Sequence, residues 1–194
     1  MTTSLQPPRK RSSHSAPSYA ARLQHDTTAW YLAARETVDS LVARSGISAH
    51  HPRVIAATPP PGTGVDYTIR GISLRVLDLP HNRTPSRRVS NVGFLVTVGG
   101  ATVLHVGDAD PTVANFAPHR LLARAIDVAI LPFWYFSGRD HATLLDAIGA
   151  CHYIASHVPL ADTASVRQQL RGSARQVTLL ATPGTQIEIP INHR

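Results

Sequence analysis

The sequence predicts an α/β fold, because strand patterns come first and then alternate with helical patterns. Residues 67–70 and 71–79 alternate apolar with polar side chains, as the strands of a half-buried hairpin do. Residues 92–98 and 102–106 flank Gly99-Gly100, a strong signal for a two-residue hairpin turn. Apolar runs and helical periods then alternate to the C-terminus. This order favours a sheet with helices packed outside it.

The N-terminal part of the chain divides into a tail and the start of a domain. Residues 1–24 are rich in Ser, Pro and Arg, which predicts a disordered basic tail. We expect residues 25–194 to form one partial domain. Within it, the apolar period over residues 28–43 indicates a helix, and residues 53–56 have strand character.

The C-terminal half is expected to contain three helices and four strands. The β-branched apolar run at residues 126–131 is typical of a strand buried on both faces. The expected helices are 113–125, 142–149 and 162–170, and the expected strands are 126–131, 152–156, 177–180 and 186–189.

Composition narrows the choice of partners. The formal net charge is +7, but Arg9, Lys10 and Arg11 lie in the tail, and Arg83, Arg87 and Arg88 lie in one expected loop. We therefore do not expect a nucleic-acid partner. No run approaches the roughly 20 apolar residues of a membrane span, and no secretory signal is visible. A cytoplasmic protein is expected. Cys151 is the single cysteine and adjoins an apolar run, which predicts a buried, inert thiol.

Three polar residues follow expected strands at the point where each strand ends. His81 comes after residues 71–79, Asp108 after residues 102–106, and His157 after residues 152–156. The ends of rigid strands are where an open α/β sheet collects its functional residues. Two imidazoles and a carboxylate suit zinc, which accepts nitrogen and oxygen ligands.

The order and spacing of these motifs resemble the metallo-β-lactamase-fold hydrolases. The segment NVGFLVTVGGATVLHVGDAD resembles the hairpin that leads to that family's bridging aspartate, which would be Asp108. LPHN resembles the motif of the third metal ligand, giving His81, and IASHVP resembles the last motif, giving His157. IDVAILPFW resembles the strand between them. The resemblance implies a metallo-β-lactamase-like αββα sandwich, truncated to its C-terminal half.

The chain departs from the family at its start. Family members carry a His-x-His-x-Asp-His loop ahead of these motifs, and no such string occurs here. His50-His51 and Asp140-His141 are poor substitutes, because both pairs stand at the wrong place in the order of motifs and adjacent residues on a strand point to opposite faces. The remaining residues would leave each metal with two protein ligands, where three or four are usual.

The resemblance implies a zinc-dependent hydrolase with one or two ions, in which Asp108 orients a metal-bound hydroxide toward a small-molecule ester, lactone, amide or phosphoester. The missing loop predicts that this activity is impaired. The alternative is a catalytically inactive remnant or binding module that keeps part of the fold. The oligomeric state is not predicted.

Several residues are expected to border the site in an intact relative. Trp134 and Tyr135 lie on the stretch after the 126–131 strand, where they either contact substrate or cap the core. Arg87, Arg88 or Arg139 could hold an anionic group of a substrate, although solvated charge is the more economical interpretation.

Overall fold

The computed structural model describes residues 28–45, 47–48, 50–84, 87–182 and 184–190. The chain divides into two compact units, Met1–Ala56 and Ala57–Arg194, which are considered separately below. The predicted tail, residues 1–24, lies outside the described residues.

In the first unit, a short strand precedes the helix that the sequence predicts. Strand β1 (Tyr31–Ala34) pairs with β2 (Val54–Ala57), and helix α2 (Arg35–Ser45) lies between them in sequence. The prediction of a helix from residue 28 is therefore wrong over its first residues. The cause is a pairing distant in sequence, because the backbone N–H of Tyr31 donates to the Arg53 carbonyl at 2.7 Å.

The second unit is built on a seven-stranded sheet. Its spatial order is β11-β10-β9-β8-β7-β4-β3. The strands are β3 (Gly64–Ile69), β4 (Ile72–Asp78), β7 (Val92–Val98), β8 (Ala101–His105), β9 (Val128–Pro132), β10 (His152–Ser156) and β11 (Val177–Leu179). Strands β3, β4, β7 and β8 pair antiparallel, whereas β8, β9, β10 and β11 pair parallel. The expected hairpins and the expected parallel strands up to β11 are confirmed.

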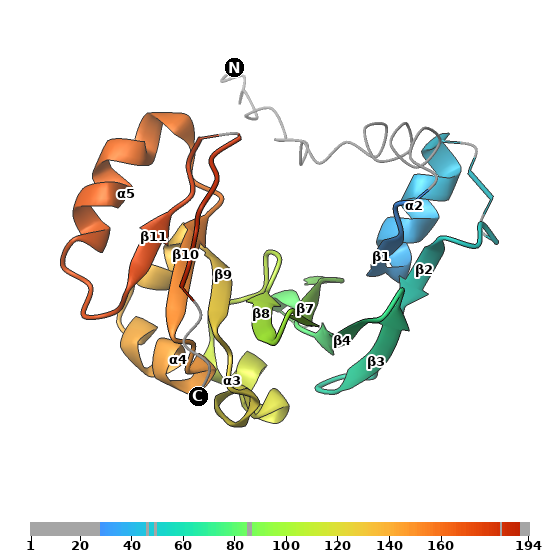
Figure 1. Ribbon diagram of the computed structural model, residues 1–194, viewed down its shortest axis with the longest axis horizontal. Helices are drawn as coiled ribbons and strands as arrows, with labels where there is room; N and C mark the ends of the chain where they lie inside the picture. The colour runs from blue at the N-terminus through green and yellow to red at the C-terminus, as the bar shows by residue number, and fades with distance from the viewer. Residues whose placement is uncertain (1–27, 46, 49, 85–86, 183, 191–194) are drawn as a thin grey trace, which may run out of the picture. The chain divides into compact units, whose positions relative to one another are not determined.

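The helical segments of this unit are short. They are α3 (Val113–Phe116), η1 (Ala117–His119), η2 (Leu121–Arg124), η3 (Phe133–Phe136), α4 (His141–Ile148), η4 (Leu160–Asp162) and α5 (Thr163–Leu170), where η denotes a 3₁₀ turn. Figure 1 shows α4 and α5 beside the strands from β9 to β11. The helices expected at residues 142–149 and 162–170 are confirmed.

Two expectations for the second half of the chain are wrong. The helix expected over residues 113–125 is broken into α3, η1 and η2, because Pro118 has no N–H for the helical ladder and Arg120 has φ +49°. Residues 186–189 form no strand, although they are among the described residues.

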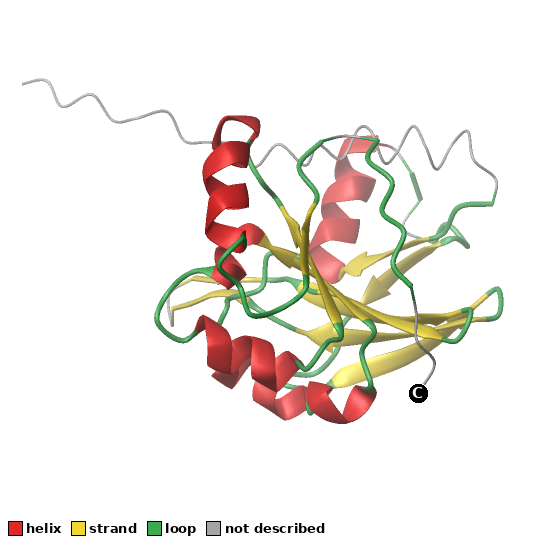
Figure 2. Ribbon diagram, turned by 60° about the vertical axis from the view of Figure 1, so that its left-hand side comes forward, coloured by secondary structure: helices red, strands yellow, loops and turns green. Residues whose placement is uncertain are grey.

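The hydrophobic core lies between the sheet and the helices. Leu104 of β8, Ala129 of β9 and Tyr153 of β10 are neighbours in register, so their side chains share one face. All three are completely buried and belong to one cluster with Leu144 and Leu145 of α4. Figure 2 shows the strands of the seven-stranded sheet as a twisted layer with helices of the same unit beside it. This packing makes the strand ends a rigid platform for the loops beyond them.

Two further features differ from expectation. The segment after Pro80, expected as a loop, contains a small two-stranded sheet of β5 (His81–Thr84) and β6 (Arg87–Val89). Cys151 is exposed, not buried, because it lies in the bend between α4 and β10.

Among the described residues, no helix has the length and apolar character needed to cross a membrane.

Candidate metal centre

Asp108 and His157 are brought together at the edge of the sheet where β8 and β10 end. Parallel strands β8, β9 and β10 present their carboxyl ends at one edge, so the loops that follow them converge. His157 Nε2 lies 3.1 Å from Asp108 Oδ1, and the two side chains are 28% and 46% exposed. The two residues thus lie together beyond the ends of their strands, as the sequence predicts.

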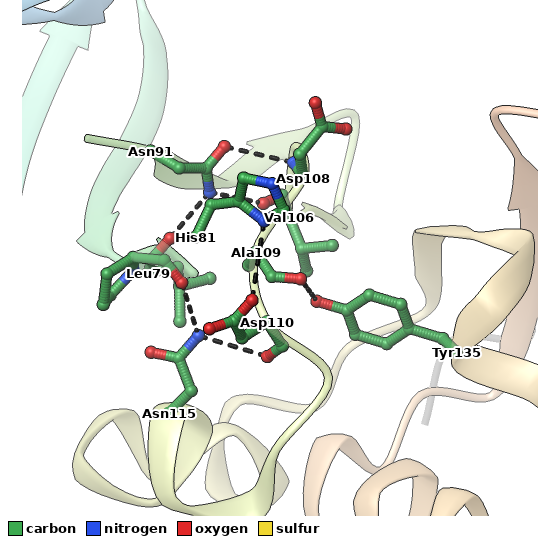
Figure 3. Close-up of polar contacts among 10 residues, drawn as sticks. Leu79, His81, Asn91, Val106, Asp108, Ala109, Asp110, Asn115 and Tyr135 are labelled. Atoms are coloured by element: carbon green, nitrogen blue, oxygen red, sulfur yellow. Dashed lines mark hydrogen bonds and ion pairs between the residues drawn. The ribbon is translucent and has the colours of Figure 1, made fainter. Parts of the chain in front are cut away.

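His81 is held by a different carboxylate. Its Nδ1 lies 3.5 Å from Oδ1 of Asp110, two residues beyond Asp108. Figure 3 shows the His81 ring directed at Asp110, with the Asp108 carboxylate turned away. The geometry therefore forms two separate acid–imidazole pairs, and the predicted grouping of His81 with Asp108 and His157 stays a prediction.

The backbone of the Asp108 loop is fixed by Asn91. The Asn91 amide donates to the carbonyl oxygens of Leu79 (2.7 Å) and Val106 (2.9 Å), and its Oδ1 accepts from the Asp108 N–H (3.1 Å). One side chain thus ties the end of β4 to the loop that carries Asp108 (Figure 3). Gly107 allows this close approach, since a Cβ there would lie 2.4 Å from Asn91 Oδ1.

Asp110 is anchored by Asn115, which is only 3% exposed. The Asn115 amide donates to the carbonyl oxygens of Pro80 (3.1 Å) and Asp110 (3.2 Å), and the Asp110 N–H donates to Pro80 (3.2 Å). These bonds hold Asp110 next to the residue before His81. The pairing of His81 with Asp110 follows from this local framework.

The 3₁₀ turn η3 contacts the His157 ring and the loop that carries Asp108. The Tyr135 hydroxyl donates to the Ala109 carbonyl at 2.6 Å, and the Trp134 ring lies edge-on to His157 with centroids 5.8 Å apart. Burial, with the nearby charges of Asp110 and Asp108, raises the pKa of Tyr135 well above its usual range. Tyr135 is fully buried, so it belongs to the core and is out of reach of a substrate.

Sequence reasoning missed His105, the last residue of β8. Burial lowers its pKa, and the positive charge of His157 lowers it further, while Asp108 opposes the shift. Its Nδ1 accepts the Gly107 N–H at 3.1 Å. The available signal was its place in VLHVGDAD, three residues before Asp108. Asn91 and Asp110 were missed as well, because their roles depend on contacts across the sheet.

The alternative histidine pairs serve local structure. His51 Nδ1 accepts the backbone N–H of Arg53 at 3.2 Å, and His141 Nδ1–H donates to the Gly138 carbonyl at 2.7 Å. Neither bond points to metal binding. Arg139 is exposed, and the side chains of Arg87 and Arg88 lie outside the described part of the chain.

The side chains of Asp108 and His157 are of the types that bind zinc, but two ligands are fewer than a zinc site needs. Oδ1 of Asp108 is buried and makes no hydrogen bond, so the nearby His157 nitrogen contacts it as an ion pair. A buried carboxylate oxygen beside an imidazole is a suitable start for a zinc site. However, no group of three or more His, Cys, Asp or Glu side chains with the spacing of a metal site occurs in the described ranges. Two ligands do not fit a tightly held catalytic zinc.

Comparison with known proteins identifies the class of fold. The chain resembles a structure from Parabacteroides distasonis that is named as a proposed metal-dependent hydrolase, at 16% identity and a TM-score of 0.50, with 77% of this chain and 63% of the other covered. It also resembles a mutant of the CmlA β-hydroxylase, at 12% identity and a TM-score of 0.52, with 78% and 38% covered. The chain thus spans less than two-thirds of either structure. At these identities the likeness concerns the fold alone.

The family follows from the sequence itself. A family model described as the beta-lactamase superfamily domain matches residues 13–152, which is most of the chain. This protein belongs to the metallo-β-lactamase superfamily. Comparison with curated protein sequences gave no significant match.

Proposed function

We propose that the chain is a zinc-dependent hydrolase of this superfamily in which metal binding and hydrolysis are impaired. The proposed metal ligands are His81, Asp108 and His157, and Asp108 is the proposed catalytic carboxylate. The observation that carries the proposal is the 3.1 Å approach of His157 to Asp108 beyond the carboxyl ends of β10 and β8, the two strands that flank β9. That pair is already assembled. His81 Nδ1 lies 3.5 Å from Asp110 Oδ1, and a carboxylate beside one ring nitrogen leaves the other nitrogen for a metal.

The proposed substrate is a small molecule with an ester, lactone, amide or phosphoester group. The loops around a site of this kind select the substrate, and the metal motifs do not specify it. With two ligands in place, we expect one zinc ion at most, held weakly. A cytoplasmic location stays a prediction from the sequence.

A second candidate is a catalytically inactive binding module. It is favoured by the described part of the chain, which holds no group of three or more His, Cys, Asp or Glu side chains placed as a metal site. The two candidates differ in whether the folded chain retains zinc, and this difference is measurable without knowing the substrate.

The test is the metal content of the purified, folded chain after dialysis against trace zinc. We expect a measurable zinc content of no more than one ion per chain, lost in Asp108→Ala and kept in Asp66→Ala, whose exposed carboxylate pairs with Arg75 away from the site. Chromogenic ester and lactone substrates should then show slow hydrolysis that depends on Asp108. A folded chain that retains no zinc would overturn the hydrolase proposal and support the binding module.

A further inference from the structure

We propose that the turn η3 positions the Asp108–His157 pair, with Tyr135 fixing the Asp108 loop and Trp134 fixing the His157 ring. Both are positioning residues, since neither is assigned a contact with substrate. The inference rests on the proposed function only in taking this pair as the working part of the site.

Tyr135 acts on the loop through one short bond. Its hydroxyl donates to the carbonyl of Ala109, the residue after Asp108, at 2.6 Å. The phenol is completely buried and packs edge-on against Phe116, with ring centroids 6.1 Å apart, so it has little freedom to follow a moving loop. Asn91 holds the other side of Asp108 by accepting its N–H. The loop is therefore clamped on both sides of the carboxylate.

Trp134 acts on the histidine ring. The two rings meet edge-to-face, with centroids 5.8 Å apart and planes at 62°, an arrangement that aromatic pairs favour. His157 itself has φ +58°, a left-handed backbone conformation that is unfavourable for a non-glycine residue. Because that conformation is not intrinsically favoured, the surroundings must retain it, and Trp134 restricts where the ring points.

The turn is also held at both of its own ends. It begins directly after Pro132, whose register partner on β10 is Ser156, the residue before His157. At its other end, the Gln169 amide of α5 donates to the Phe136 carbonyl at 3.2 Å. Because Trp134 and Tyr135 are adjacent in this anchored turn, the two arms cannot shift independently, and the turn sets the separation of Asp108 from His157.

A matched pair of variants separates positioning from general stability. Tyr135→Phe and Tyr153→Phe each remove a completely buried hydroxyl that donates to a backbone carbonyl, and Tyr153 donates to Leu145 within the core at 2.7 Å. Both variants should lower the free energy of unfolding. Only Tyr135→Phe should shift the ring NMR signals of His157 in the metal-free chain, which are assigned by their loss in His157→Gln.

The Trp134 arm has its own test in the same spectra. Trp134→Leu should shift the ring nitrogen signals of His157, which the loss of the indole ring current itself affects little, and Trp134→Phe, which keeps an aromatic edge, should restore part of the wild-type position. Equal shifts in Tyr135→Phe and Tyr153→Phe, or no shift in Trp134→Leu, would overturn the inference. A wild-type chain that retains no zinc would defeat the proposed function alone, because the NMR readout needs no metal.

Discussion

His157 and Asp108 lie 49 positions apart in the chain, yet Nε2 of one is 3.1 Å from Oδ1 of the other. The parallel strands β8 and β10 deliver them to the same edge of the sheet, and the turn η3 lies against both loops. His81, by contrast, pairs with Asp110.

Asn91 should be the most sensitive polar residue of the loop framework. Asn91→Ala leaves the carbonyl oxygens of Leu79 and Val106 and the N–H of Asp108 without their shared partner. We expect a loss of about 2–3 kcal/mol in the free energy of unfolding, measured by urea denaturation. Ser165→Ala, which removes an exposed hydroxyl, is the control and should change the free energy little. Equal effects in the two variants would contradict the assigned role.

Gly107 can be tested against a glycine with the same backbone conformation. Gly107 has φ +60° and Gly99 has φ +58°, but a Cβ at Gly107 would lie 2.4 Å from Asn91, whereas nothing lies within 4 Å at Gly99. Gly99→Ala should cost about 1–2 kcal/mol from the left-handed backbone alone. Gly107→Ala should cost clearly more in the same urea experiment, since Asn91 must also move. A smaller cost at Gly107 would show that the loop accommodates the methyl group freely.

The stability of the chain should fall in mild acid. Burial lowers the pKa of His119, assisted by Arg75 and Arg124, although its bond to the Asp78 carbonyl and the Asp78 charge oppose the shift. The folded chain therefore binds this proton less readily than the unfolded chain, whose histidines have pKa values of about 6.5. Unfolding takes up a proton below that pH, so the free energy of unfolding decreases as the pH falls.

The measurement is the urea midpoint at about pH 7.5 and about pH 5.5, on either side of the ordinary histidine pKa. His119→Gln should reduce the difference between the two midpoints, while His105, whose pKa burial also lowers, keeps part of it. An unchanged difference in His119→Gln would mean that His119 is not a source of the pH dependence.

Cys151 should react in the folded protein. It is exposed in the bend before β10, so a thiol reagent such as dithionitrobenzoate should label it without denaturant. Labelling that requires urea would support the buried thiol predicted from the sequence.

The sequence predicted the local parts of the fold well. The turn at Gly99-Gly100 is specified by two adjacent residues, and the apolar run that becomes β9 needs only its own composition. Strand β1 was missed because it depends on a bond between Tyr31 and Arg53, which no local pattern reveals. The apolar period after residue 113 predicts a longer helix than the structure contains, because a periodic pattern does not register the helix break at Pro118 and Arg120.

The site was predictable in part for the same reason. Motif residues at strand ends were found from their order, and Asp108 and His157 do meet. The partner of His81 was not foreseen, because Asp110 is oriented by Asn115 through contacts with Pro80 that join distant segments. Supporting residues such as Asn91 and Tyr135 carry no motif of their own.

Zinc titration of the metal-free chain, followed by calorimetry, tests the central claim most directly. We expect weak binding in the wild type, weakened at least tenfold in His157→Ala, a loss of about 1.4 kcal/mol or more in binding free energy. His81→Ala should weaken binding less, because the structure brings together only Asp108 and His157, and His81 is the third proposed ligand. An affinity that is unchanged in His157→Ala would contradict the account, since the assembled pair would then not hold the ion.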